Sequence, residues 1–306
     1  MTHALLVEMP GNEAMAQALA DAIEIDRVHL ELRRFPDDES YVRFRDDPRG
    51  RPVTMLCTLD RPDAKLLPLL FAAGAARDLG ATSVGLIAPY LAYMRQDRRF
   101  LSGEAVTSKH FSRLISSAFD WLITIDPHLH RRHGLSEIYS IPTRVLHAMP
   151  LLASWINENV QEALLVGPDI ESDQWVAATA SLVGAPHIVL QKTRRGDRDV
   201  EVTLPPIGRW RDRTPVLVDD IISTARTMID AIGHLARAGM RPAVCVGVHG
   251  VFAGKAYEEL LEAGAARVVT TNTIIHASNA IDVATLLLPV LSEFVRHYDA
   301  LAPGDI

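Results

Sequence analysis

Two adjacent carboxylates followed by a run of hydroxyl groups give this chain its most informative segment. Residues 215–228 read PVLVDDIISTARTM, in which the apolar run 216–218 predicts a buried strand and the pattern from Met228 predicts a helix. A turn that leads into a helix presents backbone N–H groups to an anion, and neighbouring carboxylates accept hydrogen bonds from vicinal hydroxyl groups. The segment therefore predicts a ribose 5-phosphate site. Its residues are Asp219, Asp220, Ser223, Thr224, Ala225, Arg226 and Thr227.

A structural role for the acidic pair is the alternative, because Asp219 and Asp220 could simply cap the following helix. A single Ser or Asp residue would be enough for a cap. The second acid and the hydroxyl residues that follow go beyond this need and favour the sugar-phosphate site.

The segment 192–198 holds the densest positive charge in an acidic chain. Lys192, Arg194, Arg195 and Arg198 surround Gly196, whereas the net charge of the chain is −7. A flexible basic arm of this composition could close over phosphate groups. A solvated hairpin is the alternative.

A polar cluster also follows the predicted strand 84–87, where residues 95–99 read RQDRR. A guanidinium group such as that of Arg95 can stack on adenine, and an amide such as that of Gln96 can hydrogen-bond the edge of the base. An ATP site is therefore one interpretation, and ordinary surface is the other.

The loop 35–39, FPDDE, alternates an aromatic residue with acids. Phe35, Asp37 and Glu39 stand in a Pro-containing turn before the alternating strand 41–44. Taken alone, this loop is a turn with solvated acids.

Histidines and acids at two further strand ends suggest a metal. Asp126, His128 and His130 follow the predicted strand 121–125, and Asp169 follows the strand 163–166. Mg²⁺ prefers oxygen ligands and usually keeps water and substrate phosphates, so a site of this kind needs few protein ligands. A turn-forming Pro-Asp pair is the alternative for Asp169. Two further histidines lack such a context and are expected to be structural: His133 and His147.

Strand and helix patterns alternate along the whole chain, which predicts α/β units with mainly parallel sheets flanked by helices. In such sheets, ligands bind beyond the carboxyl ends of the strands. The other expected strands are 4–7, 28–32, 53–59, 187–190, 243–248 and 267–271. The main expected helices are 62–79, 107–115, 151–159, 173–182 and 281–298.

The length of 306 residues accommodates two domains. The Pro-bounded segment 142–150 precedes a new helical pattern and predicts a crossing between them. The expected domains are 1–147 and 148–306.

The composition excludes several classes of protein. The net charge of −7 argues against a general nucleic-acid-binding surface. Cys57 and Cys245 lie in apolar strand patterns, which indicates buried thiols in a reducing compartment. The N-terminus has no basic region followed by a long apolar core, and no apolar run approaches about 18 residues. Neither a signal peptide nor a membrane span is expected, and the cytoplasm is the default location.

Eight blocks in this order resemble the ribose-phosphate diphosphokinase (PRPP synthetase) family over nearly the whole chain. The segments FLSGEAVTSKH and KTRRGDRDVEV look closer to archaeal-type members. One departure is Arg226, where the family usually has a small residue, often Gly. The blocks are FPDDE (35–39), PYLAYMRQDRR (89–99), DPH (126–128), GPDI (167–170), KTR (192–194), VDDIISTART (218–227), HGVFAG (249–254) and TNTI (271–274).

The resemblance implies two tandem type I phosphoribosyltransferase-like domains, with ATP bound partly by a neighbouring subunit and hence a homo-oligomer of at least two chains. It makes Lys192 and Arg194 the catalytic arm and assigns His128 and Asp169 to Mg²⁺. It assigns ribose 5-phosphate to the residues 219–227 named above, together with Arg194. The residues implied for ATP are Phe35, Asp37, Asp38, Glu39, Arg95 and Gln96.

The implied reaction is attack of the C1 hydroxyl of ribose 5-phosphate on the β-phosphorus of ATP, with AMP as the leaving group. Phosphoryl-type transfer needs positioning and charge stabilisation more than a protein nucleophile. Three alternatives stay open: a phosphoribosyltransferase that consumes PRPP, a non-catalytic regulatory paralogue, and a related kinase for another phosphosugar.

Overall fold

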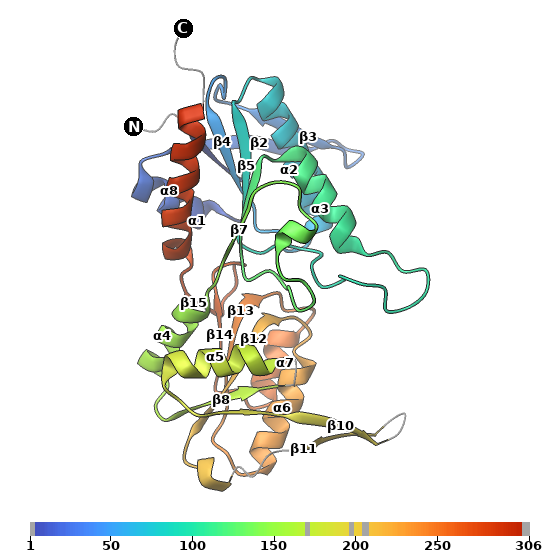
Figure 1. The fold of residues 1–306 in the computed structure, drawn as a ribbon, viewed down its shortest axis with the longest axis vertical. Helices are drawn as coiled ribbons and strands as arrows, with labels where there is room; N and C mark the ends of the chain where they lie inside the picture. Colours follow the sequence, from blue (N-terminus) through green and yellow to red (C-terminus); the bar gives the residue numbers. More distant parts are fainter. Residues whose placement is uncertain (1–3, 169–171, 196–198, 204–207, 302–306) are drawn as a thin grey trace. The chain divides into compact units, whose positions relative to one another are not determined.

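The computed structural model describes residues 4–168, 172–195, 199–203 and 208–301. The chain folds as two compact units (Figure 1), one formed by Met1–His147 with Ala284–Ile306 and the other by Ala148–Val283. Each unit contains a mainly parallel sheet and its helices, which confirms the predicted fold class. Within the part of the chain that is described, no helix is long and apolar enough to cross a membrane.

The first unit is built on a seven-stranded sheet in the order β3-β2-β1-β4-β5-β6-β7. All neighbours are parallel except β2 and β3, which form an antiparallel hairpin. Helices α1 and α8 lie on one side of this sheet in Figure 1, and α2 and α3 on the other. The strands are β1 (Leu5–Glu8), β2 (Asp26–Arg34), β3 (Ser40–Phe44), β4 (Pro52–Leu56), β5 (Ser83–Ala88), β6 (Trp121–Ile125) and β7 (Thr143–Leu146). The helices are α1 (Glu13–Ile23), α2 (Pro62–Asp78), α3 (Thr107–Ala118), the 3₁₀ turn η1 (Leu135–Glu137) and α8 (Ala284–Leu301).

Strands β4, β5 and β6 are buried at every position. This pattern is typical of parallel strands that are covered by helices on both faces. Gly85 in β5 shows how tightly they pack, because a Cβ atom there would lie 1.9 Å from the ring of Trp121. The indole can cross the neighbouring strand only because glycine has no side chain.

The second unit contains a six-stranded sheet in the order β15-β14-β13-β12-β8-β9, in which every pair is parallel. A separate antiparallel hairpin joins β10 to β11. The strands are β8 (Ala163–Gly167), β9 (His187–Val189), β10 (Gln191–Arg195), β11 (Asp199–Thr203), β12 (Thr214–Ile222), β13 (Val244–Gly250), β14 (Arg267–Thr271) and β15 (Asn279–Ile281). The helices are α4 (Met149–Asn159), α5 (Asp173–Val183), the 3₁₀ turn η3 (Gly208–Trp210), α6 (Arg226–Arg237) and α7 (Ala256–Glu262).

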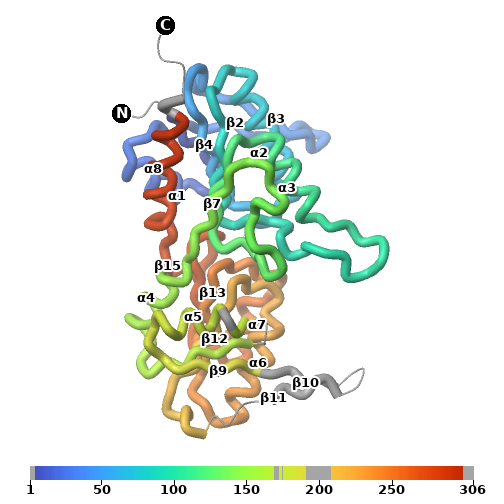
Figure 2. Tube along the Cα trace, in the orientation of Figure 1, coloured from blue at the N-terminus to red at the C-terminus, as the bar shows by residue number. Residues whose placement is uncertain are grey.

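The predicted second domain, 148–306, includes the last helix. In the structure, α8 belongs to the first unit instead. Figure 2 shows the red α8 beside the blue α1, and the two helices are in contact. The ring of Phe294 lies 4.8 Å from that of Trp121 on β6, and Arg144 donates a hydrogen bond of 3.0 Å to Glu293. The chain thus returns to the first sheet at its end, which the order of elements in the sequence does not reveal.

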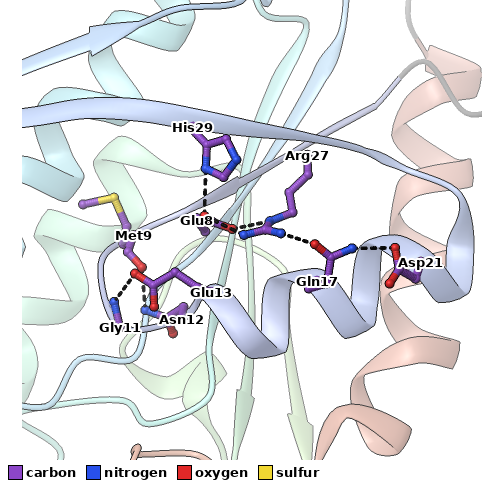
Figure 3. Close-up of polar contacts among 9 residues, drawn as sticks. All are labelled: Glu8, Met9, Gly11, Asn12, Glu13, Gln17, Asp21, Arg27 and His29. Atoms are coloured by element: carbon purple, nitrogen blue, oxygen red, sulfur yellow. Dashed lines mark hydrogen bonds and ion pairs between the residues drawn. The ribbon is translucent and has the colours of Figure 1, made fainter.

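A buried carboxylate joins the first two strands of the first unit (Figure 3). The side chain of Glu8, only 7% exposed, accepts hydrogen bonds from the Nε and Nη2 atoms of Arg27, the latter at 2.8 Å. His29 Nδ1 lies 2.9 Å from the same carboxylate. Arg27 also donates to Gln17 on α1, so this network ties β1, β2 and α1 together. The bond to Glu8 raises the pKa of Arg27.

Replacing Glu8 with Gln should lower the free energy of unfolding by about 1–3 kcal/mol, because the buried position would then direct an N–H donor toward the half-buried guanidinium of Arg27. Urea denaturation followed by tryptophan fluorescence measures the loss. Glu31→Gln is the matched control, since Glu31 pairs with exposed Arg43 and Arg45 at 3.6 and 3.7 Å. Equal effects of the two substitutions would contradict the role given to Glu8.

Candidate functional site

In the second unit, the blocks singled out in the sequence meet the sheet at the ends of four adjacent strands. GPDI begins with the last residue of β8, HGVFAG spans the end of β13, TNTI begins with the last residue of β14, and VDDIISTART spans the end of β12. These strands are neighbours and parallel, so their carboxyl ends form one edge. The strand order reverses between β8 and β12, because β9 extends the sheet one way and β13 the other. Such switch points are where open α/β sheets bind ligands.

The acidic pair lies inside strand β12, so the prediction that the strand ends at residue 218 was wrong. Strand β12 continues to Ile222, and its pairing sets Asp219 opposite Gly247 of β13. Both carboxyl side chains are half-buried, and Asp219 Oδ1 accepts a hydrogen bond of 2.9 Å from the N–H of Asp220. Pairing with β13 on both sides of Asp220 keeps the backbone of the acidic pair within the sheet.

The loop after β12 turns through a left-handed residue. Ala225 has φ +56° and is 8% exposed, and α6 begins directly after it. No side chain of the described residues caps this helix, so the N–H groups of its first turn can bind an anion. Arg226 is the first helical residue and is exposed. The small residue required by the tight turn is therefore Ala225, and Arg226 does not occupy the strained position.

Backbone hydrogen bonds hold this loop against the HGVFAG segment. The carbonyl of Ile222 accepts from the N–H groups of Val251 and Phe252, both at 3.0 Å, and that of Ser223 accepts from Ala253 at 3.1 Å. Behind them, Nδ1 of the buried His249 lies 2.8 Å from the hydroxyl of Thr273 in the TNTI segment. Three of the blocks therefore form one connected structure.

The predicted basic arm coincides with the β10–β11 hairpin, in which Lys192 pairs with Val202 and Arg194 with Val200. Gly196 and Arg198 lie outside the described residues, as does Asp169. The hairpin agrees with both interpretations of the segment, and the roles of Lys192 and Arg194 stay predictions.

In the first unit, the acidic loop 35–39 forms the tip of the β2–β3 hairpin. The N–H of Phe35 donates to the carbonyl of Glu39 at 2.8 Å, and that of Asp38 donates to the carbonyl of Phe35 at 2.9 Å. Asp38 has φ +68°, the left-handed conformation that closes a short hairpin loop. Asp37 Oδ1 accepts from the N–H of Glu39 at 3.4 Å. Four of the residues predicted to contact ATP, namely Phe35, Asp37, Asp38 and Glu39, thus lie together on one exposed tip.

Arg95 and Gln96 lie in the loop after β5. Gln96 Oε1 accepts a hydrogen bond of 3.1 Å from the hydroxyl of Thr107, the first residue of α3. This bond orients the amide and leaves its N–H₂ group as a donor. Arg95 is exposed and forms no hydrogen bond or ion pair with any residue that the structure describes. Both side chains can therefore offer N–H groups to a ligand.

The DPH block follows β6. The half-buried ring of His128 lies 4.0 Å from that of His130, centroid to centroid, in an edge-on arrangement. Asp126 Oδ1 lies 2.8 Å from Nδ1 of His147, and this hydrogen bond raises the pKa of His147. His147 was expected to be structural, and its partner could not be predicted because Asp126 lies 21 residues earlier in the chain.

Two arginines that the sequence analysis did not single out connect these loops. Arg131 Nη1 donates to Asp97 Oδ1 at 3.2 Å, and Arg132 Nη2 donates to the carbonyl of Asp97 and the hydroxyl of Ser108, both at 3.2 Å. Arg132 is 9% exposed at its side chain. The pair holds the segment with Arg95 and Gln96 against the segment with His128. The only signal in the sequence is an Arg-Arg pair beside two histidines.

Known proteins match the chain over both units. A model of the N-terminal domain of ribose phosphate pyrophosphokinase matches residues 4–118, and a phosphoribosyl transferase domain model matches 134–285. A ribose-phosphate pyrophosphokinase from Methanothermobacter thermautotrophicus is 31% identical over 290 residues, covering 94% of this chain and 100% of the relative. The chain belongs to the ribose-phosphate pyrophosphokinase family.

Other members of this family are also similar to the chain. The ribose-phosphate pyrophosphokinase of Sulfurisphaera tokodaii is 33% identical over 259 residues, covering 84% of this chain and 88% of the relative. The crystal structure of phosphoribosylpyrophosphate synthetase from Mycobacterium smegmatis superposes with a TM-score of 0.82 at 25% identity, covering 96% of this chain and 98% of that one. The predicted family is confirmed, and the first two relatives are archaeal, as the sequence suggested.

Replacing His147 with Gln should destabilise the protein more in acid than in alkali. The hydrogen bond to Asp126 raises the pKa of His147 above its ordinary 6.5, so the protonated ring stabilises the folded state. That stabilisation is complete below pH 6.5 and is lost as the pH rises through the raised pKa. The ring is 71% exposed, and solvent screening keeps the effect below about 1 kcal/mol.

Urea titrations of the wild type and His147→Gln at about pH 5.5 and about pH 8.5 measure this difference. Glutamine keeps a hydrogen-bond donor, so only the titratable charge is removed. A loss of stability that is the same at both pH values would contradict the account.

Proposed function

We propose that the protein is a ribose-phosphate diphosphokinase, which transfers the diphosphoryl group of Mg-ATP to the C1 hydroxyl of ribose 5-phosphate and yields PRPP and AMP. The observation that carries the proposal is the match over both halves of the chain to a family named for this activity. The gathering of the predicted site segments at the carboxyl ends of parallel strands supports it.

The sugar phosphate would bind to the second unit. The uncapped first turn of α6 and the hydroxyl groups of Ser223, Thr224 and Thr227 supply donors for the 5-phosphate. Asp219 and Asp220 supply acceptors for the ring hydroxyls. Their position on a rigid strand supports this role, because fixed acceptors hold the C1 hydroxyl in one orientation.

The nucleotide would bind to the first unit through Arg95, which has no ion pair among the described residues, and through the donor group of Gln96. The hairpin tip with Phe35, Asp37, Asp38 and Glu39 would reach the adenine and ribose from a neighbouring subunit. A shared site of this kind requires at least a dimer.

His128 and Asp169 would hold Mg²⁺, which enters with ATP. The donor set fits, because Mg²⁺ keeps water and substrate phosphates as ligands and needs only one or two from the protein. Asp126 of the same block is hydrogen-bonded to His147, and His128 would supply a half-buried imidazole nitrogen for this role. The ion would neutralise phosphate charge during transfer.

In the reaction, the C1 oxygen forms a bond to the β-phosphorus and the bond from that phosphorus to the bridging α,β oxygen breaks. AMP leaves with the bridging oxygen, and the proton of the C1 hydroxyl is released. Lys192 and Arg194 would neutralise the charge that shifts to the α-phosphate. Positioning and charge stabilisation account for catalysis of this kind, so no protein nucleophile is needed.

Two other functions fit less well. A phosphoribosyltransferase that consumes PRPP does not need the ATP segments 35–39 and 95–99, whereas this chain matches the N-terminal domain model over 4–118. A non-catalytic regulatory paralogue would be expected to lose site residues, and only Arg226 departs from the family pattern.

The cytoplasm is the location that suits an enzyme that makes a nucleotide precursor.

Incubation of the protein with Mg-ATP and ribose 5-phosphate tests the proposal. We expect AMP and PRPP in equal amounts. AMP without PRPP, or neither product, would overturn it, and parallel reactions with other pentose phosphates would reveal a different acceptor.

Lys192→Ala should lower kcat by about 10²–10³-fold, because the transition state loses one preorganised cation. The affinity for ribose 5-phosphate should remain, since the α6 loop binds it. Steady-state kinetics and calorimetry measure the two quantities. Arg237→Ala, at the opposite end of α6, is the control and should keep full activity. An active Lys192→Ala variant would remove the basic hairpin from the mechanism.

A further inference from the structure

One arginine of the β2–β3 hairpin differs from the others in its contacts. Arg34 lies 3.7 Å from Asp38, while Arg43 and Arg45 lie 3.6 and 3.7 Å from Glu31. Arg33 has no carboxylate partner among the described residues. Its guanidinium carbon instead lies 4.0 Å from the ring centroid of Tyr41 and 4.6 Å from that of Phe35.

The strand register explains why these three side chains meet. Arg33 pairs directly with Tyr41 across the hairpin, and Phe35 stands two residues after Arg33 on the same face. Leu32 and Val42 point to the opposite face, where they pack on the core of the unit. The Arg33–Tyr41–Phe35 group therefore shares the face of the hairpin opposite to that of Leu32 and Val42. The rings of Phe35 and Tyr41 are 6.0 Å apart and nearly perpendicular, at 88°.

The ring of Phe35 is a partly exposed member of this group. It is 39% exposed, and among the described residues it contacts the guanidinium of Arg33 and the ring of Tyr41. A pocket of about 250 Å³ is lined by Arg33 and Tyr41 of the hairpin together with Lys65 and Pro68 of α2. The guanidinium of Arg33 lies close to both rings, so it can orient the ring of Phe35 relative to that of Tyr41.

We propose that Arg33 and Tyr41 are positioning residues for the nucleotide: they hold the ring of Phe35 in the orientation in which it stacks on adenine. This inference rests on the proposed function, in which Phe35 contacts ATP. A guanidinium close to an aromatic ring is attracted to its π-electrons, and this attraction restricts the orientation of the ring. The exposed surface of Phe35 stays available to a base. Ordering the ring before binding lowers the entropy lost when ATP binds.

The test is calorimetric titration of the full-length protein with Mg-ATP in the absence of ribose 5-phosphate. Arg33→Gln and Tyr41→Leu should each raise the Kd for Mg-ATP about three- to tenfold. Tyr41→Phe keeps the ring and should stay within about twofold of the wild type, as should the matched control Arg43→Gln on the same face. In turnover assays, the KM for ATP should rise while kcat and the KM for ribose 5-phosphate stay unchanged.

A double-mutant comparison separates positioning from direct contact. In a Phe35→Leu background, Arg33→Gln should have no further effect on the Kd for Mg-ATP, because its target is absent. An unchanged Kd for Arg33→Gln alone, or the same factor in both backgrounds, would overturn the inference. Because ATP binding is measured without turnover, these outcomes are independent of whether PRPP is formed, which tests the proposed function separately.

Discussion

Parallel strands with both faces buried are the constraint on which this structure depends. Strands β8 and β13 are buried at every position, as are β4, β5 and β6 of the other unit. The side chains on such faces are mostly apolar, so polar ligand-binding residues must lie at the ends of the strands. This is why residues far apart in the sequence, such as those that follow β12, β13 and β14, reach one edge of one sheet. The switch point between β8 and β12 then separates the loops that would enclose a ligand.

Backbone interactions give the sugar-phosphate loop its shape. Carbonyls of Ile222 and Ser223 accept hydrogen bonds from residues 251–253, and Ala225 adopts a left-handed conformation that is unfavourable by about 1–2 kcal/mol for a residue with a Cβ atom. The surrounding hydrogen bonds must hold that conformation. A small side chain at 225 therefore matters more to the turn than the identity of residue 226, which explains how a bulky arginine fits there.

Much of this architecture could be predicted from the chain itself. Helices α2, α3 and α5 begin at the expected residues, because a proline or a polar residue that favours a helix N-terminus stands at each start. The site segments were found because phosphate and diol chemistry needs particular residue types in adjacent positions. The end of β12 was missed, since two acids in succession suggest a loop, whereas pairing with β13 extends the strand through them.

Other features depend on contacts between distant residues. The place of α8 follows from the packing of Phe294 on Trp121, and the role of His147 from its bond to Asp126. Neither pair has a local signal, because the partners lie on different elements. The Arg33–Tyr41–Phe35 group is an intermediate case: alternation predicts a shared face, but only the register of β2 with β3 shows that the side chains meet.

Hydrogen exchange with each ligand added separately tests the central claim most directly, namely that the α6 loop of the second unit binds the sugar phosphate and the loops of the first bind the nucleotide. Ribose 5-phosphate alone should slow amide exchange in residues 223–229, and Mg-ATP alone should slow it in 35–39 and 95–108. If ribose 5-phosphate left 223–229 unchanged while protecting segments of the first unit, the account would be contradicted.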